Sequence, residues 1–198
     1  MAPRALTVGA ASRPYPGETL NGDAWLAEQQ GERWRLTLID GLGHGPEAAA
    51  AAQAARDALA ARPDASPADA VHACHHALHH TRGAAIAIAS IDLTAGQLCF
   101  AGVGNVEARL CQEGREQRLM SYRGIVGAVL PRLRTFELPL NGDWLLLLHS
   151  DGVSARFDLS QELAGAPAEP DRLAAHLLDR YARATDDATV VVAVPAST

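Results

Sequence analysis

The chain has 198 residues, of which 48% are hydrophobic and 20% are charged, a composition typical of a globular domain with a sizeable core. Its net charge of −6 argues against a nucleic-acid partner, because a basic surface supplies most of the affinity for nucleic acid. The N-terminus lacks the apolar segment of a signal peptide, and the aliphatic run at 144–148 is too short to cross a membrane. We therefore expect one domain over residues 1–198, located in the cytoplasm.

The predicted secondary structure consists mainly of short strands joined by tight turns. Apolar or alternating segments predict strands at 6–10, 24–28, 34–39, 84–92, 97–101, 107–111, 135–140, 144–149 and 189–194. Dipeptides that end in glycine, such as Asn21-Gly22 and Asn141-Gly142, separate many of these strands and are typical of antiparallel hairpins. Helices are predicted at 46–61, 67–80 and 170–184. A helix pair between groups of strands favours two antiparallel sheets covered by helices over alternating βαβ units.

The three cysteines, Cys74, Cys99 and Cys111, do not indicate a metal or disulfide framework. Their number is odd and no pair has C-x-x-C spacing, so neither a zinc ribbon nor a set of disulfides is predicted. We expect three buried, reduced thiols.

One stretch, residues 36–48, combines a buried strand, a glycine-rich turn and the start of a helix. The apolar run ends at Asp40, and Gly41, Gly43 and Gly45 follow before the helix. Such a turn can wrap an ion or a phosphate, because glycine lets another group approach the backbone closely. The spacing does not fit the dinucleotide fingerprint, and the Gly-Lys-Ser/Thr ending of a phosphate loop is absent. Asp40 is therefore predicted either to bind a metal ion or to cap the following helix.

Carboxylates recur at three other predicted strand ends. Asp23 precedes an early strand, Asp151 follows the apolar strand at 144–149, and Asp186 and Asp187 precede the last strand. Each acid on its own could be an ordinary turn residue. Mg²⁺ and Mn²⁺ are bound by several carboxylate oxygens, so four acidic strand ends together predict a site for divalent cations.

Five histidines lie on the helix predicted at 67–80, namely His72, His75, His76, His79 and His80. Pairs spaced i and i+4 could share a zinc ion, but no carboxylate or cysteine converges with them in the sequence. An exposed polar helix face is therefore the favoured interpretation, and a histidine-rich protein for metal storage or sensing is an alternative.

Eight short motifs, taken in order, resemble the protein phosphatase 2C superfamily. They are Asn21-Gly22-Asp23, Asp40-Gly41-Leu42-Gly43-His44-Gly45, Arg82-Gly83, Gly102-Val103-Gly104-Asn105, Gly124-Ile125-Val126-Gly127, Asn141-Gly142-Asp143, Ser150-Asp151-Gly152 and Asp186-Asp187-Ala188-Thr189. Within this superfamily, the chain is most similar to the bacterial sporulation protein E-type phosphatases. Its small size resembles that of the single-domain stressosome phosphatase of the sigma-B pathway.

The resemblance implies a four-layer α-β-β-α sandwich of the α+β class, with two Mn²⁺ or Mg²⁺ ions at the rim between the sheets. Carried over by position, Asp40 would bridge both ions, and Asp23 and the Gly41 carbonyl would complete the shell of one of them. Asp151 and Asp186 would hold the other ion. Asp186 and Asp187 are adjacent, and the family pattern Asp-x-x-Thr favours Asp186 without deciding between them.

The implied reaction is hydrolysis of phosphoserine or phosphothreonine in a protein by metal-activated water, without a covalent phosphoenzyme. Asp40 and Asp151 would be catalytic through the ions that they hold. Larger relatives have histidine directly after Asp-Gly, where this chain has Leu42, and His44 follows two residues later. Its place in the glycine turn makes His44 a hypothesised proton donor to the leaving alkoxide.

The expected substrate is a folded phosphoprotein. Residues 124–134 correspond to a flap in larger relatives and are short here, so specificity would depend on docking to a partner. Family analogy suggests an anti-sigma antagonist or a stressosome component. The phosphate-binding arginine of some relatives is not assigned, since Arg13 is out of register and Arg82 has no matching position. The alternative function is a catalytically silent, phosphatase-like binding module in the same signalling pathway.

Overall fold

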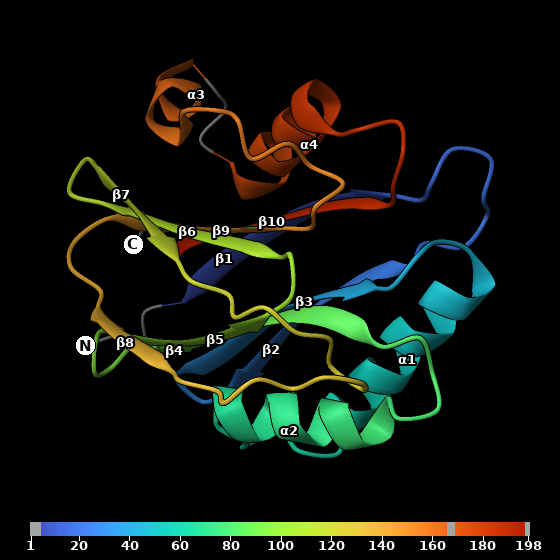
Figure 1. Ribbon diagram of the computed structural model, residues 1–198. Coiled ribbons are helices and arrows are strands. Elements are labelled where there is room, and N and C mark those ends of the chain that lie inside the picture. The colour runs from blue at the N-terminus through green and yellow to red at the C-terminus, as the bar shows by residue number, and fades with distance from the viewer. Residues whose placement is uncertain (1–4, 166–168, 197–198) are drawn as a thin grey trace.

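The computed structural model describes residues 5–165 and 169–196, and two antiparallel sheets form its centre (Figure 1). One five-stranded sheet, called the β9 sheet below, has the order β1 (Leu6–Arg13), β10 (Ala188–Pro195), β9 (Trp144–His149), β6 (Glu107–Gln112) and β7 (Arg115–Leu119). The other, called the β3 sheet, has the order β2 (Asp23–Gln30), β3 (Arg33–Gly41), β4 (Ala84–Asp92), β5 (Gln97–Val103) and β8 (Phe136–Pro139).

Helices cover the outer face of each sheet, which gives four layers (Figure 1). Helices α1 (Pro46–Ala60) and α2 (Pro67–Ala77) pack on the β3 sheet, and α3 (Leu159–Gly165) and α4 (Pro170–Tyr181) pack on the β9 sheet. The predicted α+β sandwich with α-β-β-α layers is confirmed. None of the described helices is long and apolar enough to span a membrane.

The interior between the sheets is an apolar layer to which alternate residues of each strand contribute. Leu146 and Leu148 of β9 lie in this layer with Leu36 of β3, and all three are buried. Leu145 and Leu147 point to the other face of β9, where they pack in the same cluster as residues of α4. Because β9 is covered on both faces, its sequence is continuously apolar rather than alternating.

Two short elements of the structure, β7 and α3, were not predicted from the sequence. β7 is an edge strand whose sequence, Arg-Glu-Gln-Arg-Leu, is largely exposed, so it has no apolar alternation to reveal it. α3 has seven residues, which is shorter than the window that a helical apolar pattern needs. The helices predicted to end at 80 and 184 end at Ala77 and Tyr181, and Ala182 is already extended and bridges to Val153.

The prediction of three buried thiols is correct for one cysteine. Cys74 is buried between α2 and the β3 sheet, and burial raises the pKa of its thiol to about 12. Cys99 and Cys111 are partly exposed, because their strands place them on sheet faces that the helices leave incompletely covered. All three cysteines are free thiols.

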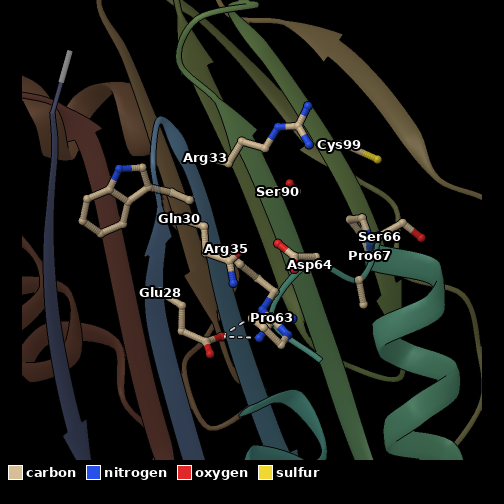
Figure 2. A pocket seen from close by; sticks show the side chains of 12 residues that line it. Glu28, Gln30, Arg33, Arg35, Pro63, Asp64, Ser66, Pro67, Ser90 and Cys99 are labelled. Carbon is tan, nitrogen blue, oxygen red and sulfur yellow. Dashed lines mark hydrogen bonds and ion pairs between the residues drawn. The ribbon is translucent and has the colours of Figure 1, made fainter. Parts of the chain in front are cut away.

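Towards the start of β3, a buried arginine ties helix α1 to the sheet (Figure 2). Arg35 Nη2 lies 2.7 Å from Glu28 Oε2 and donates to the Leu59 carbonyl at 2.9 Å, while Nη1 donates to the Arg62 carbonyl at 2.7 Å. These carbonyls lie at the C-terminal end of α1 and in the turn that follows it, where each also accepts one backbone N–H. The hollow of about 280 Å³ drawn in Figure 2 therefore has at its centre a charge that is already paired, and we assign it no ligand.

Replacing Arg35 by leucine is expected to lower the free energy of unfolding by about 3 kcal/mol, because Glu28 and two carbonyls lose a buried donor. Urea unfolding measures this loss. The control is Arg33→Leu on the same strand, since the Arg33 side chain is 74% exposed and its ion pair with Asp92 lies at the surface. Its effect should stay within about 0.5 kcal/mol. Equal losses in both variants would contradict this role of Arg35.

Candidate metal centre

The acidic strand ends predicted from the sequence meet at one end of the sandwich. Asp23 begins β2 and lies directly opposite Asp40, near the end of β3. Asp151 follows β9, and Asp186 and Asp187 precede β10, which pairs with β9. These five residues are called the acid cluster below. The β3 sheet contributes two of them and the β9 sheet contributes three, so the cluster bridges the two sheets.

Asp23 is held by a serine from the other sheet. Its Oδ2 accepts a hydrogen bond from Ser150 Oγ at 2.6 Å, and the same Oγ accepts one from the Thr189 backbone N–H at 3.0 Å. Burial raises the pKa of Asp23 to about 7, with smaller increases from the charges of Asp187 and Asp151, while the bonds from Ser150 and Thr189 oppose the rise. The carboxylate is therefore fixed in place although its charge is poorly stabilised.

Asp40 lies at the centre of the acid cluster. Burial raises its pKa well above the usual value, and the negative charges of the other four acids raise it further, Asp23 most of all. Its Oδ2 is buried, and no residue within the described ranges forms a hydrogen bond with it. A buried carboxylate oxygen without a donor is costly, so this atom requires a cation or a proton.

Asp151 is oriented by Asn105, whose Nδ2 donates to Asp151 Oδ2. Burial raises the pKa of Asp151, and the charge of Asp186 raises it further, while Arg183 and the Asn105 bond lower it. Asn105 belongs to the loop between β5 and β6, so it connects a third segment of the chain to the cluster.

Asp186 and Asp187 occupy different environments. Asp187 is buried, and its Oδ1 accepts a hydrogen bond from the Tyr15 backbone N–H at 2.8 Å. Asp187 Oδ2 would lie 2.6 Å from a Cβ at position 22, where the chain has glycine. Asp186 is only partly buried, and its side chain lies within reach of Asp151. The neighbour of Asp151 is thus Asp186, whereas Asp187 lies on the side of Gly22 and Asp23.

The composition of the acid cluster fits divalent cations. Hard cations take carboxylate oxygens, and this cluster contains two buried oxygens without a donor, Asp40 Oδ2 and Asp187 Oδ2. Burial and mutual repulsion also raise the pKa values of three of its acids, Asp23, Asp40 and Asp151. Within residues 5–165 and 169–196, however, no three His, Cys, Asp or Glu side chains are already arranged around one point as metal ligands. Three of the acids instead face a donor: Asp23 faces Ser150, Asp151 faces Asn105 and Asp187 faces the Tyr15 N–H.

His44 lies in the glycine turn, against the loop between β1 and β2. Its ring stacks on Tyr15 with centroids 4.1 Å apart and planes at 14°, and its Nδ1 lies 3.2 Å from Glu18 Oε1. The Glu18 carboxylate packs on Gly45, whose φ of +74° and lack of a Cβ leave room for it. The imidazole is thus fixed on two sides, and no described residue forms a hydrogen bond with its Nε2.

The sequence matches the family described as Stage II sporulation protein E (SpoIIE) over residues 30–194. The chain belongs to this family. The match confirms the resemblance predicted from the motifs, and it places the chain among the protein phosphatase 2C-type serine/threonine phosphatases. No curated protein sequence matches the chain.

Solved structures extend the comparison for this SpoIIE family member. A chain from work described as "The bacterial stressosome: a modular system that has been adapted to control secondary messenger signaling" is 31% identical, with a TM-score of 0.90 over 96% of this chain and 99% of that chain. RsbX in complex with magnesium is 19% identical, with a TM-score of 0.86 over 96% of both chains. The catalytic domain of PstP with two manganese ions is 20% identical, with a TM-score of 0.75 over 97% of this chain and 99% of that chain.

Two arginines near the acid cluster of this family member have roles that the sequence motifs did not indicate. Arg13 Nη2 donates to the Arg183 carbonyl at 2.7 Å, so Arg13 supports a loop. The Arg183 N–H donates to the Gly152 carbonyl at 2.7 Å, and the charge of the Arg183 side chain lowers the pKa of Asp151. No sequence motif contains Arg183, and its position three residues before Asp186 is the only signal that could have identified it.

Arg82 and two of the histidines predicted on the helix at 67–80 contact other parts of this family member. Arg82 pairs with Glu47 in the first turn of α1 and lies over the glycine turn at Gly43. His75 Nδ1 accepts the Gly127 N–H at 2.9 Å, and His79 Nδ1 donates to the Gly127 carbonyl at 3.1 Å. Four of the five histidines, His72, His76, His79 and His80, are exposed as predicted, and His75 is partly buried.

Proposed function

We propose that this protein is a metal-dependent phosphatase that hydrolyses phosphoserine or phosphothreonine on a signalling protein. The observation that supports this proposal most strongly is the buried, donorless Oδ2 of Asp40 at the centre of an acid cluster in a chain of this family. A silent binding module would have no use for such a group, because five acids at a sheet junction destabilise a protein that binds no cation. Residues 1–198 form a single catalytic domain in this proposal.

The metal ligands that we propose are the ones implied by the motifs. Asp40 would bind both ions, Asp23 and the Gly41 carbonyl would complete one shell, and Asp151 and Asp186 would complete the other. The contact between Asp186 and Asp151 supports Asp186 over Asp187 for this role. The magnesium and manganese ions in the RsbX and PstP structures support the choice of Mg²⁺ or Mn²⁺. When bound, the ions supply charge compensation and acidify water for attack on phosphorus.

Residues of the chain that do not bind metal would position the reacting groups. Ser150 and Asn105 hold the carboxylates of Asp23 and Asp151 in fixed orientations, which reduces the reorganisation that metal binding requires. The cationic side chain of Arg183 lies near Asp151 and would attract the phosphoryl oxygens of the substrate.

The substrate that we propose is a phosphoprotein of the stressosome or an anti-sigma antagonist. The chain from work on the bacterial stressosome supports this choice, because it is 31% identical to this chain over nearly the whole of both chains. A chain with RsbU and RsbW domains is 22% identical to this protein. A likeness at this identity supports the fold but not the choice of substrate.

Phosphate release from p-nitrophenyl phosphate and from a phosphoserine-containing stressosome protein tests the proposal. We expect turnover with Mn²⁺ or Mg²⁺ and its loss with EDTA or in an Asp151→Ala variant. A folded protein that releases no phosphate from either substrate with any metal would instead be the silent binding module.

His44 is proposed to protonate the leaving oxygen, and Glu18 is proposed to position its imidazole. His44→Ala should lower turnover of a phosphoserine substrate about a hundredfold, because a serine alkoxide is a poor leaving group without a proton. Turnover of p-nitrophenyl phosphate should fall much less, because nitrophenolate leaves without protonation. Steady-state kinetics of both substrates measures this difference.

Glu18→Gln provides the positioning test. It should lower phosphoserine turnover, though less than His44→Ala does, and leave p-nitrophenyl phosphate turnover nearly unchanged, since the imidazole loses the Glu18 contact that helps to orient it. Undiminished phosphoserine turnover in His44→Ala would eliminate the proton-donor role.

A further inference from the structure

A hollow of about 460 Å³ opens beside the acid cluster, and none of the proposed catalytic roles uses it. Its walls are formed by Leu42, Ala85, Asn105, Arg123 and Ile125, with glycines at 104 and 124. Apolar surface predominates in it, and Arg123 contributes its only charged side chain. The hollow is called the Arg123 hollow below.

The Arg123 hollow shares walls with the acid cluster. Ala85 lies directly opposite Asp40 in the register of β3 and β4. Asn105, on another wall, donates its hydrogen bond to Asp151. Leu42 follows the proposed ligand Gly41 in the chain. A phosphorylated residue bound at the acid cluster would therefore place a neighbouring side chain of its own chain in this hollow.

The outer wall of the hollow, residues 121–127, is held firmly against the β3 sheet. The Tyr122 N–H donates to the Gly102 carbonyl at 2.9 Å, and the Gly104 N–H donates to the Tyr122 carbonyl at 2.8 Å. Val126 exchanges two backbone hydrogen bonds with Ala84 at 2.9 and 3.0 Å.

The histidine pair secures the end of the same wall. His75 of α2 and His79, which follows the end of α2, bind the N–H and the carbonyl of Gly127. On the sheet side, Gly104 has a φ of +94°, and a Cβ there would collide with Ala85. The hollow thus exists before any ligand arrives, so filling it requires little ordering of the protein.

The chemistry of the walls defines the occupant. Leu42, Ala85 and Ile125 offer a surface for an aliphatic side chain. Arg123 is exposed, and among the described residues it has no ion-pair partner. In a chain of net charge −6, an unpaired arginine at this position attracts an acidic group.

We infer that the Arg123 hollow is a specificity subsite that receives an aliphatic residue adjacent to the phosphorylated residue, with an acidic residue next to it paired to Arg123. This inference rests on the proposed function, because the phosphorylated residue must bind at the acid cluster. It assigns a recognition sequence to the substrate, which the family match does not.

Fluorescence anisotropy with labelled peptides tests the subsite without catalysis. Each peptide carries a phosphonate analogue of phosphoserine, so that the enzyme with Mn²⁺ cannot consume it. The same two residues flank the analogue on both sides, because either chain direction could fill the hollow. The flanking residues are Glu and Leu in the first peptide, Lys and Leu in the second, and Glu and Gly in the third. The wild-type protein should bind the first peptide about tenfold more tightly than either of the others.

Charge reversal at Arg123 should reverse the preference. Arg123→Glu should bind the Lys-Leu peptide more tightly than the Glu-Leu peptide. Arg115→Glu is the matched control, because Arg115 is exposed at the far end of β7 beside the turn to β6, and it should retain the wild-type order. Thermal melting confirms that each variant is folded.

The outcomes separate this inference from the proposed function. Equal affinities for the three peptides in the wild type, or an unchanged order in Arg123→Glu, would overturn the subsite. The predicted order of affinities in a protein that hydrolyses neither p-nitrophenyl phosphate nor a phosphoserine protein would support the subsite and refute the phosphatase. Hydrolysis without any peptide preference would do the reverse.

Discussion

Asp40→Asn is expected to lower Mn²⁺-dependent phosphate release at least about a thousandfold, because it removes the one carboxylate proposed to bind both ions. The amide keeps the shape of the side chain but loses the negative charge that the ions need. Initial rates with p-nitrophenyl phosphate and with a phosphoserine protein measure the loss.

Folding of this variant should not be impaired, because the buried Oδ2 of Asp40 lies among other acids and the substitution removes repulsion. Asp143→Asn is the matched control, since Asp143 is an exposed acid in the turn before β9. It should retain wild-type rates. Activity of Asp40→Asn comparable to that of Asp143→Asn would exclude the proposed centre.

The metal-free protein is expected to lose stability as the pH rises from about 4 to about 7. Burial raises the pKa of Asp23 from 3.8 to about 7, so the folded state binds a proton more tightly than the unfolded state does. The contribution of Asp23 to the free energy of unfolding is therefore greatest below pH 4, and it declines until Asp23 is ionised in both states. The difference between the two pKa values corresponds to about 4 kcal/mol.

Urea unfolding in EDTA between pH 4.5 and 7.5 measures this decline. The comparison protein is Asp23→Asn, whose unfolding free energy should depend less steeply on pH because residue 23 no longer titrates. Mn²⁺ added at pH 7.5 should stabilise the wild type more than the variant, since binding to the folded state alone adds to its stability. Identical pH dependence in the two proteins would contradict the raised pKa of Asp23.

The elements with strong apolar patterns could be predicted from the sequence, and those without could not. The predicted ranges of β4 and β9 coincide with the observed strands, because both are long apolar runs bounded by glycine or charged residues. β7 has an edge position and a polar sequence, so nothing in its pattern distinguishes it from a loop. The antiparallel pairing followed from the turns, but the order of strands in each sheet depends on contacts between distant segments.

The acid cluster was predictable as a set, because Asp23, Asp40, Asp151 and Asp186 all occur at strand ends. Their supporting residues were not. Ser150 and Asn105 occur within predicted motifs, yet their bonds to Asp23 and Asp151 join residues 127 and 46 positions apart.

Glu18 carries no sequence signal at all. It lies in the loop between β1 and β2 and meets His44 only because that loop folds over the glycine turn. Such contacts arise from the tertiary arrangement and have no local pattern.

The division of the acid cluster between two sheets makes its geometry a property of the entire interface between them. Any change that slides one sheet along the other displaces Asp151 and Asp186 relative to Asp23 and Asp40. A core substitution far from the rim, such as one at Leu36, can therefore reduce turnover while leaving every ligand intact. Screens for loss of activity in this protein should therefore recover interior positions as well as the acids. The two groups of variants can be distinguished, because only the interior variants regain activity when compensating core substitutions restore the sheet spacing.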